Sequence, residues 1–557
     1  MTLHRRAFLK HVGLGTAGLS AASSLRIGLL ADEAGPHQNL PRSSLQTQGV
    51  VSSGIWDFLE AIPVANIELH SFMLVRHGHV VSECWWAPYR RDATHWLYSL
   101  SKSFTSTAVG FAVAEGKLKI EDRVVDFFPD RLPPNVSDNL ADLRIKHLLS
   151  MSIGHKTDST VAVAFNPAQP DWVRTFLSLP IENPPGSVFL YDSGGSFMLS
   201  AIVQKVTGQK VIDYLEPRLF EPLQIRQRSW QSSPLGINCG GWGLSVATET
   251  LAKFGQLYLQ KGQWNGKQLL PSQWVEEATT FKIQQPVTWS SGSGQAAEAE
   301  RAAALADPAA ALARLRQSSD WYQGYAYQFW RCRHNAFRGD GAFGQFCVVL
   351  PDEDAVVAIT SETGNLQGIL NLVWDHLLPA MHDGPVNNGR TVDARLALTL
   401  RTRALPLPHG VPRSAMMSAI SAKTFTLEPN SLGMESVTLQ FAADSCLFTL
   451  KNAKGRYDVR CGLGKWLDGT TQMPGEPPAL LPNSEQGPLK LAAAGAWQED
   501  GTFEMQWRFY ETPHHDIVTC KFHGDDVQIQ FSNSITTALG PNQTLHPESR
   551  PVLKGHA

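Results

Sequence analysis

The sequence predicts an α+β fold: an antiparallel sheet flanked by helices, followed by a C-terminal domain that is an all-β barrel. Three observations support this prediction. Strand patterns lie near both ends of residues 45–385, and helix patterns lie between them. A stretch punctuated by proline and glycine follows, as is typical of a domain boundary. Beyond that stretch, apolar and polar residues alternate with the period of two that a strand with one buried face produces.

The length of the chain also requires more than one hydrophobic core. Single cores stop growing at about 250–300 residues, and this chain has 557. We expect four segments along it, which are an export signal at 1–35, the sheet-and-helix domain at 45–385, a linker at 386–420 and the barrel-like domain at 421–557.

The first segment is predicted to be a targeting signal. Arg5 and Arg6 precede a weakly apolar run at 12–22, and this order resembles a bacterial twin-arginine export signal. It predicts export of the folded protein to the periplasm or the extracellular space. A plain basic amphipathic N-terminus is the alternative. The apolar run is too short to cross a bilayer and no later segment is long enough, so we expect no stable membrane span.

The sheet-and-helix domain opens and closes with strand patterns. An apolar hairpin is predicted at 69–86, with its turn at His77-Gly78. A helix that is apolar on most faces, and therefore buried, is predicted from Ser99 to Leu118. The remaining predicted elements are helices at 199–206 and 248–260 and strands at 348–350 and 355–360. Strands at both ends imply one sheet whose strand order differs from the chain order.

Residues 292–317 differ from their surroundings. A serine- and glycine-rich stretch passes into an alanine-rich segment that carries three arginines. We interpret it as a helical insertion on the surface, near the entrance to the site. The alternative is a mobile loop that has no role in function.

The last segment shows the pattern of several consecutive strands. Apolar residues alternate with polar ones in three runs, at 437–441, 503–509 and 527–531, and 523–526 is a turn between two of these runs. This pattern predicts an antiparallel barrel or sandwich with one buried face. The tandem His514-His515 is expected on a surface turn.

Composition excludes several classes of function. The 48 basic and 51 acidic residues give a formal net charge of −3, so no basic excess indicates nucleic-acid binding. The seven cysteines form no Cys-x-x-Cys pair, and no cysteine–histidine cluster has zinc spacing. We therefore expect no metal and no cofactor, and mostly buried thiols with room for a single disulfide.

Ser99-Leu100-Ser101-Lys102 is an S-x-x-K motif at the start of the predicted buried helix. Residues three apart lie on one helical face, so the Ser99 hydroxyl and the Lys102 amine can touch. Serine is a poor nucleophile until a base takes its proton, and a lysine desolvated among apolar neighbours has a lowered pKa. Lys102 is the only lysine of the chain with a serine three residues before it. An ordinary helix start with a solvent-facing lysine is the alternative.

Two later segments complete a pattern. Tyr191-Asp192-Ser193 follows a kink at 184–186, so the tyrosine can point back at the serine as a proton shuttle. The glycine-rich segment 338–345 precedes a strand, and glycines there let a ligand or another backbone come close. A structural tyrosine and a simple bulge are the alternatives. His155 lies nearby in sequence, and a packing role is favoured for it over a place in the pocket.

The order S-x-x-K, Y-x-S, G-x-G resembles the serine β-lactamase and penicillin-binding superfamily. The resemblance runs from about residue 50 to 380 and is closest to the class C-like branch, which includes esterases, D-aminopeptidases and amide hydrolases. It implies a β-lactamase-like sheet with Ser99 as the nucleophile and Lys102 and Tyr191 as its catalytic partners. The residues that it implies for the oxyanion hole and substrate binding are Ser193, Gly339, Asp340, Gly341 and Ala342.

Two departures from the family pattern bear on the substrate. The tyrosine motif usually ends in asparagine, whereas Ser193 stands here. The third motif usually begins with lysine or histidine, whereas Gly339 stands here and Asp340 follows it. The cation that meets the carboxylate of a β-lactam is therefore absent from that position, and alternation along the strand points Arg338 to the face opposite Gly339.

Two hypotheses from different classes remain. In the first, the chain is a serine hydrolase that acts through an acyl-enzyme on a small ester, amide or peptide and is at most a weak β-lactamase. In the second, it is a non-catalytic penicillin-binding-like receptor. The first is favoured because Ser99, Lys102 and Tyr191 are all present, and because the sequence holds no G-x-S-x-G elbow, H-E-x-x-H motif or phosphate-binding loop.

Overall fold

The computed structural model describes residues 39–288, 302–421, 423–473, 488–535 and 550–557. The predicted targeting signal at 1–35 lies outside these residues. In the described part of the chain, no helix has both the length and the apolar character that a membrane crossing needs.

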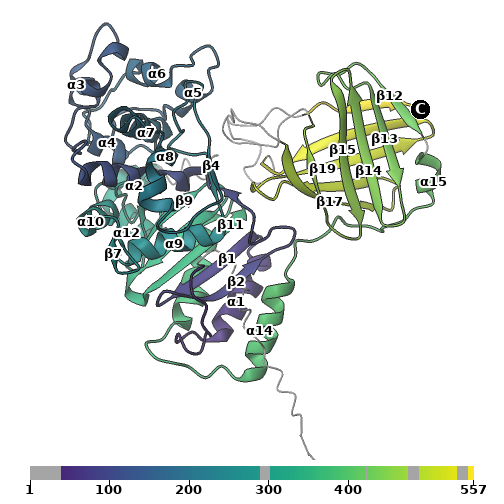
Figure 1. The fold of residues 1–557 in the computed structure, drawn as a ribbon, viewed down its shortest axis with the longest axis horizontal. Helices are drawn as coiled ribbons and strands as arrows, with labels where there is room; N and C mark the ends of the chain where they lie inside the picture. The colour runs from purple at the N-terminus through teal and green to yellow at the C-terminus, as the bar shows by residue number, and fades with distance from the viewer. Residues whose placement is uncertain (1–38, 289–301, 422, 474–487, 536–549) are drawn as a thin grey trace, which may run out of the picture. The chain divides into compact units, whose positions relative to one another are not determined.

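The first domain is built on a six-stranded sheet in which every pair of neighbours is antiparallel (Figure 1). Its order is β2 (His79–Trp85), β1 (Glu68–Arg76), β11 (Ala355–Glu362), β10 (Gln345–Leu350), β9 (Phe337–Gly341) and β8 (Trp330–Arg331). The predicted hairpin and the predicted later strands are therefore neighbours. This confirms the fold class and the strand order that departs from the chain order.

Helices cover both faces of this sheet (Figure 1). Met73 and Val75 face the side on which α2 and α9 pack, while Phe72 and Leu74 face α1 and α13. The α-helices among the described residues include α1 (Ser52–Val64), α2 (Ser101–Ala114), α3 (Asp138–Asp142), α4 (Ile145–Leu149), α5 (Thr160–Ala164), α6 (Trp172–Ser178), α7 (Ser193–Thr207), α8 (Val211–Leu215), α9 (Thr248–Leu259), α10 (Ser272–Thr279), α12 (Pro308–Ser318), α13 (Leu366–Leu372), α14 (Arg390–Thr402) and α15 (Met416–Ile420).

Small strands complete the first domain. They are β3 (His95–Trp96), β4 (Arg228–Trp230), β5 (Leu244–Val246), β6 (Gln263–Trp264) and β7 (Lys267–Gln268). β3, β5 and β4 form a three-stranded sheet, and the first of these strands leads directly into the turn that carries Ser99.

The second domain is a closed barrel with one extra strand. Its strands are β12 (Thr424–Leu427), β13 (Ser436–Phe441), β14 (Ser445–Asn452), β15 (Gly455–Leu463), β16 (Leu467–Thr471), β17 (Leu489–Trp497), β18 (Phe503–Arg508), β19 (His515–His523), β20 (Asp526–Asn533) and β21 (Leu553–His556). The strands pair in the order β15-β14-β13-β12-β21-β20-β19-β18-β17-β16, and every pair of neighbours in this order is antiparallel. β15 also pairs in parallel with β17, which closes nine of the strands into a barrel. The predicted barrel is confirmed, and the parallel closure is an addition to the predicted antiparallel pattern.

The segment predicted as a linker contains a packed helix. In α14, Leu396 is buried against the first domain and the Arg395 guanidinium lies 4.8 Å from the Trp56 ring centroid. Leu396 and Leu400 are four residues apart and so share one face of the helix, and this face packs on the first domain, whereas Leu398 is exposed.

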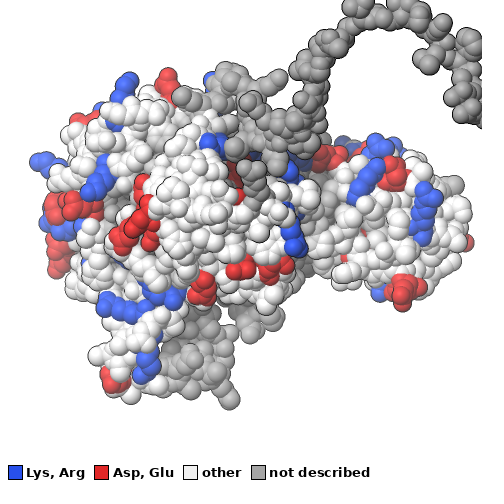
Figure 2. Space-filling model, turned by 90° about the horizontal axis from the view of Figure 1, so that it is seen from below, with Lys and Arg blue, Asp and Glu red and all other residues white. Residues whose placement is uncertain are grey.

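The cysteines and the surface charges can each be compared with what the composition predicts. All seven cysteines are buried free thiols, so the disulfide for which the sequence left room does not form. Lysine and arginine side chains are interspersed with aspartate and glutamate on the face drawn in Figure 2, as their near balance predicts.

Candidate functional site

Ser99 lies in a single 3₁₀ turn, Tyr98–Leu100, that runs directly into α2. The helix is buried along residues 101–112 because it is apolar or small on every face. Phe104, for example, stacks on Phe254 with ring centroids 4.0 Å apart. The serine itself is only half-buried, so a rigid element presents it to an accessible surface.

Lys102 lies one turn further and touches the serine. Its Nζ is 2.9 Å from Ser99 Oγ, 3.0 Å from Ser193 Oγ and 2.8 Å from the Gly241 carbonyl oxygen. Burial lowers the pKa of Lys102 to about 7, although nearby carboxylates, Asp158 foremost, oppose the shift. A neutral amine at this position can donate its two hydrogens to Ser193 and Gly241 and aim its lone pair at the Ser99 hydroxyl.

Tyr191 meets Ser99 from the other side. Its side chain lies close to Ser99, its ring stacks on Trp330 with centroids 5.6 Å apart, and Lys102 Nζ lies 4.8 Å from the ring centroid. Burial, supported by the Asp340 carboxylate, raises the pKa of Tyr191 far above its usual value. The phenol is therefore protonated at neutral pH and can act as a proton donor.

Asp192 holds the tyrosine loop in place. It is the N-cap of α7, and its Oδ1 accepts hydrogen bonds from the N–H groups of Gly194 and Gly195. Its Oδ2 lies 2.7 Å from His155 Nδ1, and the imidazole packs on Phe176. The packing interpretation of His155 is the one that these contacts support.

The glycines of the third motif let β9 pass close to the nucleophile. A Cβ on Gly341 would lie 2.0 Å from the Leu97 carbonyl oxygen and 3.2 Å from Ser99 N. A Cβ on Gly339 would lie 2.7 Å from Ser103 Oγ. Side chains at these positions would force β9, and with it Ala342 directly after the strand, away from Ser99.

Asp340 does not act as a free charge. Its Oδ2 accepts a hydrogen bond of 2.9 Å from Nε of Arg338, two positions earlier on the same face of the strand, and both side chains are buried. Arg338 also lies over Trp321, 4.3 Å from the ring centroid. An unpaired carboxylate at Asp340 would repel a substrate carboxylate, but here the adjacent Arg338 cation compensates its charge.

Sequence reasoning missed Asp158. This residue lies in the loop before α5, where its Oδ1 accepts hydrogen bonds from Thr160 N at 3.0 Å and from Thr160 Oγ1 at 2.5 Å. Although the residue reaches the surface, the packing around its carboxyl group and the nearby Asp192 raise its pKa to about 6. Among the described residues it forms no ion pair. No motif marks it, because only the fold brings it toward Lys102.

The expectation for the tandem histidines is wrong. His514 is fully buried, and its Nε2 lies 2.5 Å from the hydroxyl of Tyr98, the residue before Ser99. His515 is partly buried and lies 2.9 Å from Glu362. Nothing in the local sequence signals this burial.

The insertion is helical where the structure describes it. Residues 289–301 lie outside the described residues, and α12 follows them with most of its side chains exposed. Near the end of this helix, the Arg316 guanidinium donates a hydrogen bond of 2.6 Å to Oε1 of Gln284. A place at the entrance to the site stays a prediction.

Part of this chain is similar to known proteins. The family model described as Beta-lactamase matches residues 70–370, which is just over half of the chain. The chain is 26% identical over 220 residues to 6-aminohexanoate-dimer hydrolase of Paenarthrobacter ureafaciens, covering 37% of this chain and 56% of that protein. It is 28% identical over 147 residues to a putative D-alanyl-D-alanine carboxypeptidase of Escherichia coli K12, covering 24% and 34%. Each match thus spans less than two thirds of the curated relative.

A solved structure, the putative 6-aminohexanoate-dimer hydrolase from Bacillus anthracis, is also similar to this chain. It superposes with a TM-score of 0.44 at 17% identity, over 65% of this chain and 87% of the other.

Proposed function

Because this chain belongs to the beta-lactamase family, we propose that it is a serine hydrolase that cleaves a small ester or amide through an acyl-enzyme on Ser99. The observation that carries the proposal is the contact of 2.9 Å between Lys102 Nζ and Ser99 Oγ. Burial lowers the pKa of the lysine to about 7, so a base is present where a serine nucleophile needs one.

The proposed reaction uses each of the three groups once in acylation. Lys102 takes the proton of Ser99 as Oγ bonds to the carbonyl carbon of the substrate. When the bond to the leaving group breaks, the Tyr191 hydroxyl protonates that group and regains a proton from the Lys102 ammonium. Water then attacks the acyl carbon, Lys102 takes a proton from it, and the proton returns to Ser99 as the acid product leaves.

The backbone N–H groups of Ser99 and Ala342 are proposed as the oxyanion hole. Gly341 supports this role because its backbone passes beside Ser99 N with no room for a side chain. Two N–H groups aimed at one point stabilise the negative charge that develops on the carbonyl oxygen.

The third motif favours substrates that lack a carboxylate at the place where a β-lactam carries one. Gly339 carries no cation and has no space for one. The three nearby arginines have other partners: Arg331 bonds the Thr279 carbonyl, Arg333 bonds Asp320 and Arg338 bonds Asp340.

We therefore expect kcat/KM to be about a hundredfold lower for a chromogenic cephalosporin than for p-nitrophenyl acetate. A lost charge-assisted hydrogen bond costs about 1.5–3 kcal/mol, which is about 10- to 150-fold in rate. Steady-state kinetics on both substrates measure this ratio and also test the hydrolase function. Efficient cephalosporin turnover would contradict the charge argument, and turnover of neither would contradict the proposed activity.

Asp158 supports a substrate that carries an amine. Its carboxylate lies near Lys102, forms no ion pair among the described residues, and is ionised above a pH of about 6. An ammonium group on a bound substrate would supply the missing cation. The name of one relative, 6-aminohexanoate-dimer hydrolase, fits an amino-bearing amide.

We expect Asp158→Asn to raise KM about 10-fold for an amino-bearing amide and to leave KM for p-nitrophenyl acetate within about twofold. Parallel kinetics on an ω-amino acid p-nitroanilide and on the neutral ester measure the difference. Asp126→Asn, at another exposed aspartate, is the control for loss of one carboxylate. Equal changes on both substrates would show that Asp158 does not recognise an amine.

We also propose that the protein is exported by the twin-arginine route, to the periplasm or beyond. The Arg5-Arg6 motif and the weakly apolar run after it support this proposal.

A further inference from the structure

The residue before the proposed nucleophile has an unusual backbone. Tyr98 has φ +47°, in the left-handed region that residues other than glycine rarely adopt. Such a residue persists only when its surroundings hold it. Tyr98 is buried, and its hydroxyl lies 2.5 Å from Nε2 of His514, which comes from the barrel.

The conformation of Tyr98 sets the direction of the Ser99 N–H group, because one planar peptide unit joins the two residues. The Tyr98 carbonyl of that unit accepts a hydrogen bond of 2.7 Å from Ser101 Oγ. Ser101 Oγ in turn accepts one of 3.1 Å from the Leu244 N–H. In a trans peptide the N–H points opposite to the C=O, so the Ser99 N–H is directed away from the helix that Ser101 begins.

The Ala342 N–H, the other proposed donor of the oxyanion hole, also has a neighbouring residue in the left-handed region. Phe343 follows Ala342 and has φ +66°. Its ring packs edge-on against His514, with centroids 4.7 Å apart, and lies 5.3 Å from the Tyr98 ring. Ile535 of the barrel joins the same apolar cluster. One imidazole therefore contacts both of the left-handed residues that flank the proposed oxyanion hole.

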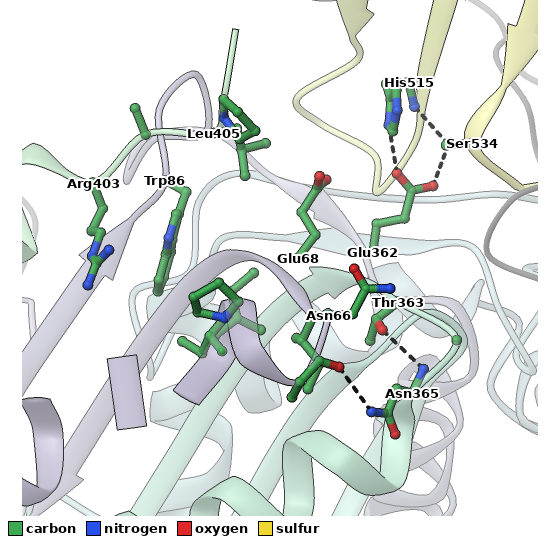
Figure 3. Close-up of a pocket in the computed structure, with 18 of the residues that line it drawn as sticks. Asn66, Glu68, Trp86, Glu362, Thr363, Asn365, Arg403, Leu405, His515 and Ser534 are labelled. Atoms are coloured by element: carbon green, nitrogen blue, oxygen red, sulfur yellow. Dashed lines mark hydrogen bonds and ion pairs between the residues drawn. The ribbon is translucent and has the colours of Figure 1, made fainter. Parts of the chain in front are cut away.

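His514 is itself anchored to the first domain. Its Nδ1 lies 2.7 Å from Oε1 of Glu362, the last residue of β11. An Nδ1–H that donates to this carboxylate leaves Nε2 as the acceptor for the Tyr98 hydroxyl. Figure 3 shows the Glu362 carboxylate facing His515 and Ser534 of the barrel, which also hydrogen-bond it. Glu362 thus fixes the orientation of the imidazole.

We propose that His514 is a positioning residue for the hydrolase site: through Tyr98 and Phe343, the barrel holds the oxyanion hole in its working geometry. The inference rests on the proposed function of Ser99 and assigns part of that function to the C-terminal domain. A group that only orients N–H donors acts on the transition state, where the oxyanion exists, and not on ground-state binding.

The test compares Tyr98→Phe and His514→Phe with the unmodified full-length protein on p-nitrophenyl acetate. Tyr98→Phe removes only the hydroxyl, and His514→Phe keeps a ring but removes both nitrogen atoms. Each should lower kcat by about 10- to 100-fold and leave KM within about twofold, since small displacements of catalytic groups cost that much. The double variant should be little worse than the poorer single variant, because both changes break one bond.

His515→Gln is the matched control, because His515 also contacts Glu362 but makes no ring contact with Tyr98 or Phe343 among the contacts described. It should keep kcat near that of the unmodified protein. Thermal unfolding identifies variants that fail to fold, and Tyr98→Phe keeps the test valid if His514→Phe does not fold. Unchanged kcat in Tyr98→Phe, or a rise in KM alone, would overturn the inference. An unmodified protein without activity would instead overturn the proposed function.

Discussion

Replacing Ser99 with alanine is expected to lower turnover of p-nitrophenyl acetate by about 10⁴-fold or more, the scale seen when a serine nucleophile is lost. No acyl-enzyme can form without Oγ, and the remaining groups only bind the substrate and polarise its carbonyl. Lys102 would keep its contacts with Ser193 and Gly241, so the fold of the site should survive. Initial rates at saturating ester measure the effect.

Ser106→Ala is the matched control on the same helix. The Ser106 hydroxyl is buried and has no hydrogen-bond partner among the described residues, so its removal should leave the rate nearly unchanged. Turnover that persists in Ser99→Ala would indicate another nucleophile.

Replacing Lys102 with alanine is expected to lower kcat/KM by about 10²–10⁴-fold, the usual contribution of a general base. It should also change the pH profile. In the unmodified protein the pKa of Lys102 is about 7, and only the neutral amine accepts the serine proton, so kcat/KM should rise as the pH increases through about 7. Lys102→Ala should lose this rise.

Lys253→Met serves as the control for loss of a buried lysine. Burial lowers the pKa of Lys253 as well, but its Nζ bonds the Leu223 carbonyl oxygen at 2.9 Å, and Ser99 is not among the contacts described for it. The pH profile of this variant should keep its rise near 7. A profile of Lys102→Ala that retains the rise would assign the titration to another group.

Much of the fold could be predicted because it is encoded locally. The small and apolar residues that occupy most faces of residues 99–118 predict a buried helix, and α2 is one. The alternation of Phe503, Met505 and Trp507 predicts a strand with one buried face, and all three side chains lie in the barrel core. Closure by the parallel pairing of β15 with β17 depends on register between distant segments, which no local pattern records.

The parts of the site that were missed depend on contacts between distant segments. His514 follows Thr512-Pro513 and looks like a turn residue, but its partners Tyr98 and Glu362 lie 416 and 152 residues away in sequence. Asp158 likewise has no local signal. Strand alternation does place Arg338 and Asp340 on one face, yet whether they pair with each other or reach a substrate depends on the packing around them.

The most direct test of the central claim is covalent labelling with a fluorophosphonate probe, followed by peptide mapping. The account predicts rapid labelling of the unmodified protein on Ser99, no labelling of Ser99→Ala, and protection by excess p-nitrophenyl acetate. Lys102→Ala should label much more slowly, because its serine lacks the base. A protein that turns over no ester and takes no label on Ser99 would contradict the account and favour a non-catalytic receptor built on the same fold.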